Sequence, residues 1–97
     1  MKNLEEIKNI IRHQKPVLIK KHKIKDIGIF GSYVRGEQRL NSDVDILISF
    51  EEFPGLIKFV GIENELSEYL GIKVDLVTKT GLKHGIGKHI LKEVVYL

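Results

Sequence analysis

Two carboxylates one residue apart, Asp43 and Asp45, alternate with apolar residues in the stretch SDVDILISF. Alternate side chains of a β-strand lie on the same face, so both carboxylates are expected to point one way, with Cα atoms roughly 6–7 Å apart. Two anions at that separation repel and raise each other's pKa unless a cation lies between them. A hard cation such as Mg²⁺ prefers carboxylate oxygens, so the pair favours a magnesium site. The alternative is a half-exposed strand with an acidic outer face.

A third carboxylate, Asp75, lies in a later apolar run, IKVDLV, which also predicts a strand. If this strand neighbours the one that carries Asp43 and Asp45, three carboxylates converge. Such a set suits two metal ions, which can bind the attacking and leaving oxygens of an in-line phosphoryl or nucleotidyl displacement. The alternative is an Asp at a strand end that accepts hydrogen bonds from backbone N–H groups.

The pair Gly31-Ser32 follows the short apolar run IGIF and precedes a predicted helical turn. A strand that enters a helix through Gly leaves free N–H groups at the helix start, where an anion is favoured. Arg35, three residues on, lies on the same helical face as Ser32, and its guanidinium suits phosphate oxygens. These residues indicate a phosphate-binding turn. The alternative is a capped helix with an ordinary surface Arg.

Apolar spacing, together with Gly and Pro, predicts the elements that position these side chains. Pro16 is expected to interrupt the N-terminal helix, while Gly36 and Gly71 are expected to end the helices before them. The pattern is α/β, with one domain over residues 1–97 and a sheet that can bury one face against helices. Helices are predicted at 3–14, 16–23, 32–35, 56–70 and 88–93, and strands at 27–30, 44–50, 72–77 and 94–97.

Composition narrows the class of protein. The chain has 97 residues, 42% of them hydrophobic, and a net charge of +3. This supports a packed core and is too mild a charge to indicate a nucleic-acid partner by itself. There is no cysteine, which fits a reducing compartment and excludes thiolate metal sites. The N-terminus is charged throughout and no apolar run could span a bilayer, so we expect a cytoplasmic protein without a membrane partner.

Gly31-Ser32, a ten-residue spacer and Asp43-x-Asp45 form a specific combination, which resembles the signature of the nucleotidyltransferase superfamily that includes DNA polymerase β. The longer runs GSYVRGEQRLNSDVDILISF, GIKVDLVT and HILKEVVYL resemble the minimal nucleotidyltransferases (MNT proteins), the antitoxin partners of HEPN-domain toxins. Val34 departs modestly from the Ala usual in this family. The resemblance implies a polymerase β palm-like nucleotidyltransferase fold, a small mixed β-sheet with helices packed on it.

The resemblance also implies a role for each residue of the motif. Asp43 and Asp45 match Mg²⁺ ligands, and Asp75 matches the third carboxylate, which completes a site for two ions and helps deprotonate the acceptor. Gly31 and Ser32 match positions that hold the nucleoside triphosphate, and Arg35 matches the Arg of the family's motif.

The implied reaction is transfer of AMP from ATP to a tyrosine hydroxyl of a HEPN ribonuclease toxin. The enzyme and toxin would form a hetero-oligomer, without direct nucleic-acid binding by this chain. Two alternatives remain open: an antitoxin that neutralises its toxin by binding alone, and nucleotidyl transfer to a small molecule or RNA.

Overall fold

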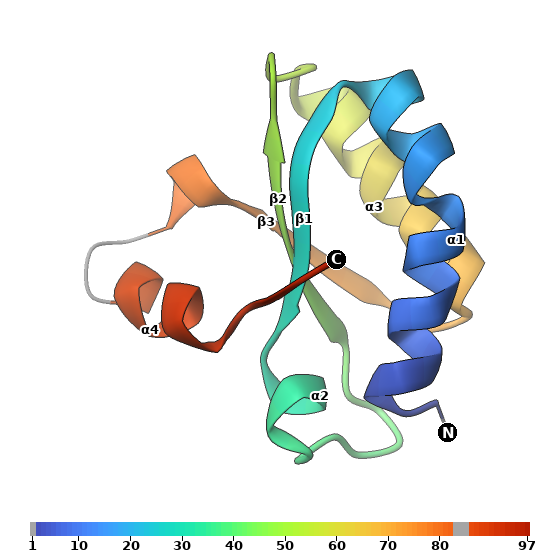
Figure 1. The fold of residues 1–97 in the computed structure, drawn as a ribbon, viewed down its shortest axis with the longest axis vertical. Coiled ribbons are helices and arrows are strands. Elements are labelled where there is room, and N and C mark those ends of the chain that lie inside the picture. The colour runs from blue at the N-terminus through green and yellow to red at the C-terminus, as the bar shows by residue number, and fades with distance from the viewer. Residues whose placement is uncertain (1, 83–85) are drawn as a thin grey trace.

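Helices and strands alternate along the chain around one four-stranded sheet (Figure 1). The computed structural model describes residues 2–82 and 86–97. Its elements are α1 (Leu4–His22), β1 (Ile24–Phe30), α2 (Ser32–Arg35), β2 (Val44–Phe50), α3 (Leu56–Leu70), β3 (Val74–Thr78), the 3₁₀ helix η1 (Lys79–Gly81), α4 (Ile86–Glu93) and β4 (Val95–Tyr96). The strand order is β3-β2-β1-β4, with β1 antiparallel to β2 and β4, and β2 parallel to β3. The predicted α/β class with a mixed sheet is confirmed.

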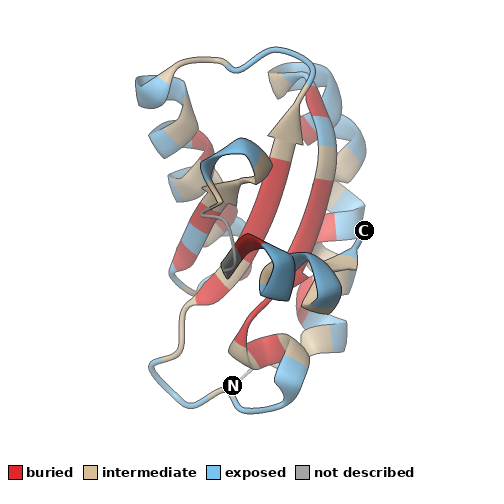
Figure 2. Cartoon of the chain, turned by 90° about the vertical axis from the view of Figure 1, so that its left-hand side faces the viewer, coloured by how far each residue is buried: buried red, intermediate tan, exposed pale blue. Residues whose placement is uncertain are grey.

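The two faces of the sheet have different coverings. On β2, the side chains of Val44, Ile46 and Ile48 are fully buried in the core that α1 and α3 share with the sheet. The residues between them, which include Asp45, point to the opposite face because side chains alternate along a strand. In Figure 1, α4 lies on that opposite side, across the sheet from α1 and α3. Figure 2 shows the buried residues concentrated along the strands.

The first helix differs from its prediction, because α1 runs unbroken from Leu4 to His22 with Pro16 inside it. A proline removes one helical hydrogen bond, which is why the sequence predicts an interruption of the helix at Pro16. Ile7, Ile11 and Leu18 are all buried on one helical face, so packing against the sheet maintains the helix on both sides of the proline. Pro16 itself is exposed, on the solvent side of the helix, where water can satisfy the carbonyl group that loses its partner.

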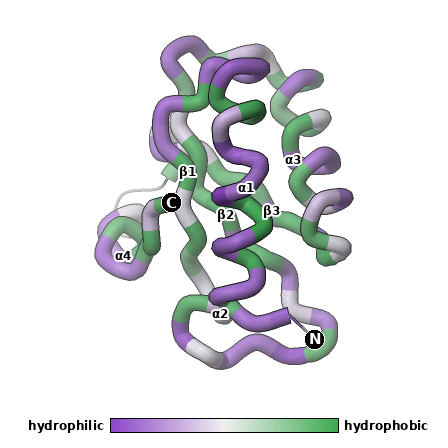
Figure 3. The backbone as a smooth tube through the Cα atoms, turned by 45° about the vertical axis from the view of Figure 1, so that its right-hand side comes forward, coloured by the Kyte–Doolittle hydropathy of each residue, from purple (hydrophilic) through white to green (hydrophobic). Residues whose placement is uncertain are grey.

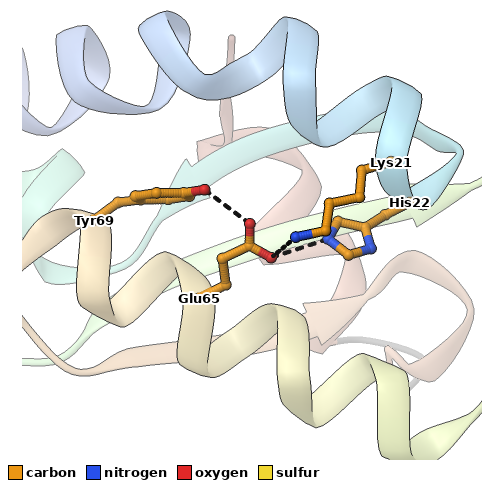
Figure 4. Close-up of polar contacts among 4 residues, drawn as sticks. All are labelled: Lys21, His22, Glu65 and Tyr69. Atoms are coloured by element: carbon orange, nitrogen blue, oxygen red, sulfur yellow. Dashed lines mark hydrogen bonds and ion pairs between the residues drawn. The ribbon is translucent and has the colours of Figure 1, made fainter.

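A carboxylate joins α1 to α3 on the covered side of the sheet (Figure 4). Glu65 Oε1 lies 3.0 Å from His22 Nε2, and Tyr69 donates its hydroxyl to Glu65 Oε2 at 2.8 Å. Lys21 Nζ lies 3.5 Å from the same carboxylate. Burial acts to raise the pKa of Glu65, but hydrogen bonds from His22 and Tyr69 outweigh it and lower the pKa. The charged form of Glu65 therefore stabilises the contact between the two helices.

Most predicted elements are present with shifted ends. β1 begins at Ile24 rather than at residue 27, because the pairing with β2 extends to Asp26 opposite Ser49 and Ile24 opposite Phe50. Helix α3 has the predicted bounds, and the predicted last strand is present as Val95–Tyr96. Helix α4 starts at Ile86, earlier than the predicted helix over residues 88–93.

Hydropathy follows the layers of the fold (Figure 3). The strands of the sheet are mainly hydrophobic, while α1 alternates between hydrophobic and hydrophilic positions along its length. Within residues 2–82 and 86–97, no helix combines the length and the apolarity that crossing a membrane requires.

Candidate active site

The predicted site residues meet at one end of the sheet. β1 ends at Phe30, which pairs with Asp45 across the antiparallel ladder. On its other side β2 pairs with β3 in parallel, and there Asp45 is in register with Asp75. Paired residues of neighbouring strands lie about 5 Å apart with their side chains on the same face. The expectation that the Asp75 strand neighbours the strand of Asp45 is confirmed.

The β2–α3–β3 connection produces this register. Parallel strands need a long crossover, and here it is a helix that packs on the sheet through Ile62, Leu66 and Leu70. The crossover returns the chain to the same end of the sheet from which β2 started. Residues 45 and 75, thirty positions apart in the sequence, therefore face the same surface beside each other.

Gly31 is packed directly against Asp45. A Cβ atom placed on Gly31 would lie 2.0 Å from Asp45 Oδ2, which is closer than real Cβ atoms come, and 3.2 Å from Asp45 Cβ, which is an unusually tight contact. Its backbone, with φ 81° and ψ −154°, also lies in a region that residues with a side chain rarely adopt. Gly31 thus serves two purposes: it turns the chain from β1 into α2, and it leaves space for the carboxylate.

Ser32 opens α2 and is partly exposed, and Val34 and Arg35 donate their N–H groups to the carbonyl of Gly31. The first N–H groups of a helical turn have no partner within the helix, which here applies to those of Ser32 and Tyr33. A Ser hydroxyl and such N–H groups next to a carboxylate pair form a polar turn of the kind that can bind phosphate oxygens.

Asp43 directly precedes β2 and is half-buried. It lines a hollow of about 260 Å³ together with Leu40, Gly71 and others, and its charge contributes to the raised pKa of Tyr33, whose main cause is burial. Asp75 lies on β3, the edge strand, and is exposed. Of the three carboxylates, Asp45 is therefore the central one and Asp75 the most accessible to an incoming molecule.

The electrostatics of Asp45 reflect its neighbours. Burial, followed by the charges of Asp75 and Asp43, raises the pKa of Asp45 to about 6. Arg35 acts in the opposite direction but does not compensate. A bound cation would favour the charged form of this carboxyl and so offset both the burial and the repulsion that raise its pKa.

The fit of a divalent cation rests on the type and placement of these donors. Within the described part of the chain, no three Asp, Glu, His or Cys side chains lie close enough to hold one metal ion as they stand. However, Asp45 and Asp75 are in register on one face, Asp43 acts on Asp45, and all three offer the oxygen ligands that Mg²⁺ prefers. The chemistry of these donors therefore suits Mg²⁺.

One residue of the site was missed by the sequence predictions. Glu93, the last residue of α4, accepts a hydrogen bond from Gly31 N–H at Oε2 (2.9 Å) and one from Arg35 Nη1 at Oε1 (2.7 Å). Arg35 also contacts Glu37 at 3.2 Å. The structure thus places Arg35 beside the predicted turn but pairs it with two carboxylates. Glu93 lies within the run HILKEVVYL that carries part of the resemblance, but its distance from Gly31 in the sequence gave no reason to assign it to the site.

Comparison with known proteins agrees with this geometry. Residues 4–97 match the nucleotidyltransferase domain family. The chain belongs to this family. The predicted nucleotidyltransferase fold and enzyme class are confirmed.

Individual relatives match over almost the whole chain. The protein adenylyltransferase MntA of Thermococcus cleftensis is 52% identical over 97 residues, which cover 100% of this chain and 98% of the relative. A solved structure of a minimal nucleotidyltransferase has a TM-score of 0.82 at 32% identity, covering 99% of this nucleotidyltransferase and 97% of that chain. A crystal structure of a toxin–antitoxin MntA–HpeT mutant has a TM-score of 0.70 at 25% identity, covering 100% of this chain and 72% of the other.

Proposed function

We propose that this nucleotidyltransferase transfers AMP from ATP to a tyrosine hydroxyl of a HEPN-domain toxin and thereby acts as its antitoxin. The observation that carries the proposal is the position of Asp45, in register with Asp75 on one side and packed against Gly31 on the other. That arrangement puts the predicted metal ligands beside the predicted phosphate-binding turn. The relative at 52% identity is named a protein adenylyltransferase, which favours a protein as the acceptor.

In this proposal the carboxylates of Asp43, Asp45 and Asp75 would hold two Mg²⁺ ions. When bound, Mg²⁺ supplies positive charge that attracts the phosphates and lowers the pKa of an oxygen bound to it. Gly31 has no side chain and so leaves the space that the Asp45 carboxylate occupies. The pKa of Asp45 is raised, and a bound cation would lower it again. Ser32 offers its hydroxyl, and the start of α2 its N–H groups, to the triphosphate.

The proposed transfer forms one bond and breaks one. The tyrosine oxygen bonds to the α-phosphorus of ATP while the bond from that phosphorus to the leaving diphosphate breaks. The hydroxyl proton passes to the carboxylate of Asp75, which is exposed on the edge strand and so within reach of a protein acceptor. A tyrosine has an ordinary pKa near 10, so a base and a cation are both needed at neutral pH.

The partner class rests on the relatives. A toxin–antitoxin MntA–HpeT structure has the same fold across the whole of this chain. We propose that this protein forms a hetero-oligomer with a HEPN toxin and does so in the cytoplasm. Its role there is modification of the toxin, without direct binding of nucleic acid.

The test is AMP transfer in a defined mixture. The protein is incubated with labelled ATP, Mg²⁺ and a candidate HEPN-domain partner, and the label is located by mass spectrometry. We expect label on a partner tyrosine, and loss of it with Asp43→Asn, Asp45→Asn or Asp75→Asn. Asp26→Asn is the matched control: Asp26 lies on the same sheet near its other end, where it bonds to Ser49 and Lys79, so transfer should persist.

Three outcomes contradict the proposal in different ways. Full transfer by Asp43→Asn or Asp45→Asn would refute the metal assignment. A tight complex without label would indicate neutralisation by binding alone. Label on RNA or on a small molecule, with none on the partner, would replace the acceptor class.

A further inference from the structure

Glu93 is almost enclosed, and both of its carboxylate oxygens are occupied. Its side chain is 12% exposed, against 43% for its partner Arg35. One oxygen accepts the N–H of Gly31 at 2.9 Å and the other accepts Nη1 of Arg35 at 2.7 Å. Burial acts to raise the pKa of Glu93, yet the bonds from Gly31 and Arg35 outweigh it and lower the pKa. The side chain is thus charged at neutral pH and linked to two parts of the predicted nucleotide-binding turn.

The register of β4 sets the place of this carboxylate. β4 pairs with β1 so that Val95 lies opposite Ile29 and Tyr96 opposite Gly28. Glu93 precedes β4 by two residues, and Gly31 follows Ile29 by two. The antiparallel ladder therefore brings Glu93 beside Gly31, at the point where α4 returns to the sheet (Figure 1).

The contact bears on the conformation of the turn. Gly31 has no side chain to restrict its backbone angles, so its conformation depends on the contacts that its backbone makes. The bond from Gly31 N–H to Glu93 is such a contact, and Gly31 in turn lies against Asp45. Glu93 thus acts on the carboxylate centre through the glycine, without itself belonging to the predicted metal ligands.

The same contact limits what Arg35 can do. Its guanidinium faces Glu93 at 2.7 Å and Glu37 at 3.2 Å, so its single positive charge is shared between two carboxylates. Arg35 therefore connects α2 to α4, and because the two carboxylates neutralise its charge, it attracts a phosphate group only weakly.

We infer that Glu93 is a positioning residue for nucleotide transfer, which fixes the Gly31 turn against Asp45 and through which Arg35 acts. The inference rests on the proposed function, since it assumes that the turn binds the triphosphate. It assigns Arg35 an indirect role in place of the direct phosphate contact that the sequence suggests.

The test is the dissociation constant of ATP with Mg²⁺, measured by titration calorimetry on the whole chain well below its melting temperature. Glu93→Ala removes both contacts and should weaken binding about tenfold, the scale of one lost hydrogen bond to a charged group. Glu93→Gln keeps an oxygen for Gly31 N–H but loses the ion pair, so binding should weaken only about threefold.

Glu65→Gln is the matched control. Glu65 also joins two helices through a partly buried carboxylate, but on the covered face of the sheet (Figure 4). It should lower the melting temperature without changing the dissociation constant. This separates a positioning effect on the turn from a general loss of stability.

A double-mutant cycle with Arg35→Met tests the second half of the inference. If Arg35 acts through Glu93, adding Arg35→Met to Glu93→Ala should weaken binding no further. Additive losses would show that Arg35 contacts the triphosphate itself and would overturn this half.

Two results would overturn the role of Glu93. Unchanged ATP binding in Glu93→Ala would show that the contact only stabilises the fold, and tighter binding in Glu93→Gln would show that Glu93 competes with phosphate. Both results concern the variants and so differ from a failure of the proposed function. In that failure the natural sequence itself would bind no ATP in the presence of Mg²⁺, and the inference about Glu93 would be refuted together with the proposed function.

Discussion

Replacing Gly31 by alanine tests whether close contact with Asp45 shapes the site. Two penalties apply to Gly31→Ala: a backbone with φ 81° and ψ −154°, and a Cβ that would meet Asp45 Oδ2 at 2.0 Å. The chain contains a natural control in Gly55, which precedes α3 as Gly31 precedes α2. Gly55 has φ 96° and ψ 161°, and a Cβ there would meet nothing within 4 Å. Gly55→Ala therefore carries the backbone penalty alone.

The structure gives the size of each effect. A residue with a side chain in this backbone region costs about 1–3 kcal/mol, which both variants share. Rotating the Asp45 carboxylate removes the 2.0 Å overlap, but its Cβ, 3.2 Å away, moves only with the backbone of β2. Forcing an extra methyl group into such packing costs about 1–3 kcal/mol more. The free energy of unfolding of Gly31→Ala should therefore be lower than that of Gly55→Ala by about 1–3 kcal/mol, the cost of the added methyl group.

Urea unfolding of both variants, followed by circular dichroism, measures that difference. A melting temperature lower by roughly 4 °C for each 1 kcal/mol should accompany it in Gly31→Ala. Gly31→Ala should also lose binding of ATP with Mg²⁺, while Gly55→Ala keeps it. Equal destabilisation by the two substitutions, with ATP binding retained in both, would refute the constraint that Asp45 places on Gly31.

Three further predictions concern charge and metal. The pKa of Asp45 is about 6 in the folded, metal-free chain and about 3.9 in the unfolded chain, so its contribution to stability falls as the pH rises from about 4 to 6. In EDTA at pH 8, Asp45→Asn should therefore unfold at a higher urea concentration than the natural sequence. At pH 4 the two should unfold at the same urea concentration. The pKa of Glu65 is lowered, so its contribution to stability is present near neutral pH and lost in acid. Glu65→Gln should therefore lower the free energy of unfolding by about 1 kcal/mol at pH 7, and by less at pH 3. Millimolar Mg²⁺ with ATP should raise the melting temperature of the natural sequence but not of Asp45→Asn, since ligands stabilise only a state that binds them.

Much of the site could be predicted because its signals are local. The ten-residue spacer between Ser32 and Asp43 accommodates α2 and a loop, and Gly36 and Gly71 end their helices as expected. The alternation of Val44, Ile46 and Ile48 assigned Asp45 to the face of β2 opposite the core. The neighbourhood of β2 and β3 was conditional, and the parallel register of Asp45 with Asp75 confirms it.

The features that were not predicted depend on contacts between distant segments. Pro16 carries a strong local signal to end a helix, and packing of Ile11 and Leu18 on either side overrides it. Glu93 reads as a polar residue on a short helix until β4 pairs with β1 and brings it to Gly31. The pairing of Arg35 with Glu93 depends on the same long-range register, so motif spacing alone assigned the arginine to phosphate.

The pairing of β4 with β1 also has a kinetic consequence. It joins Gly28 to Tyr96, and contacts between residues so far apart in sequence form slowly because a large loop must close first. If the Glu93–Gly31 bond forms after the folding transition state, its main effect is to slow unfolding. Opening of this edge should release the Gly31 turn while the core beneath α1 and α3 persists. The lifetime of a competent site would then be set by how long the β1–β4 edge stays closed rather than by the stability of the whole fold.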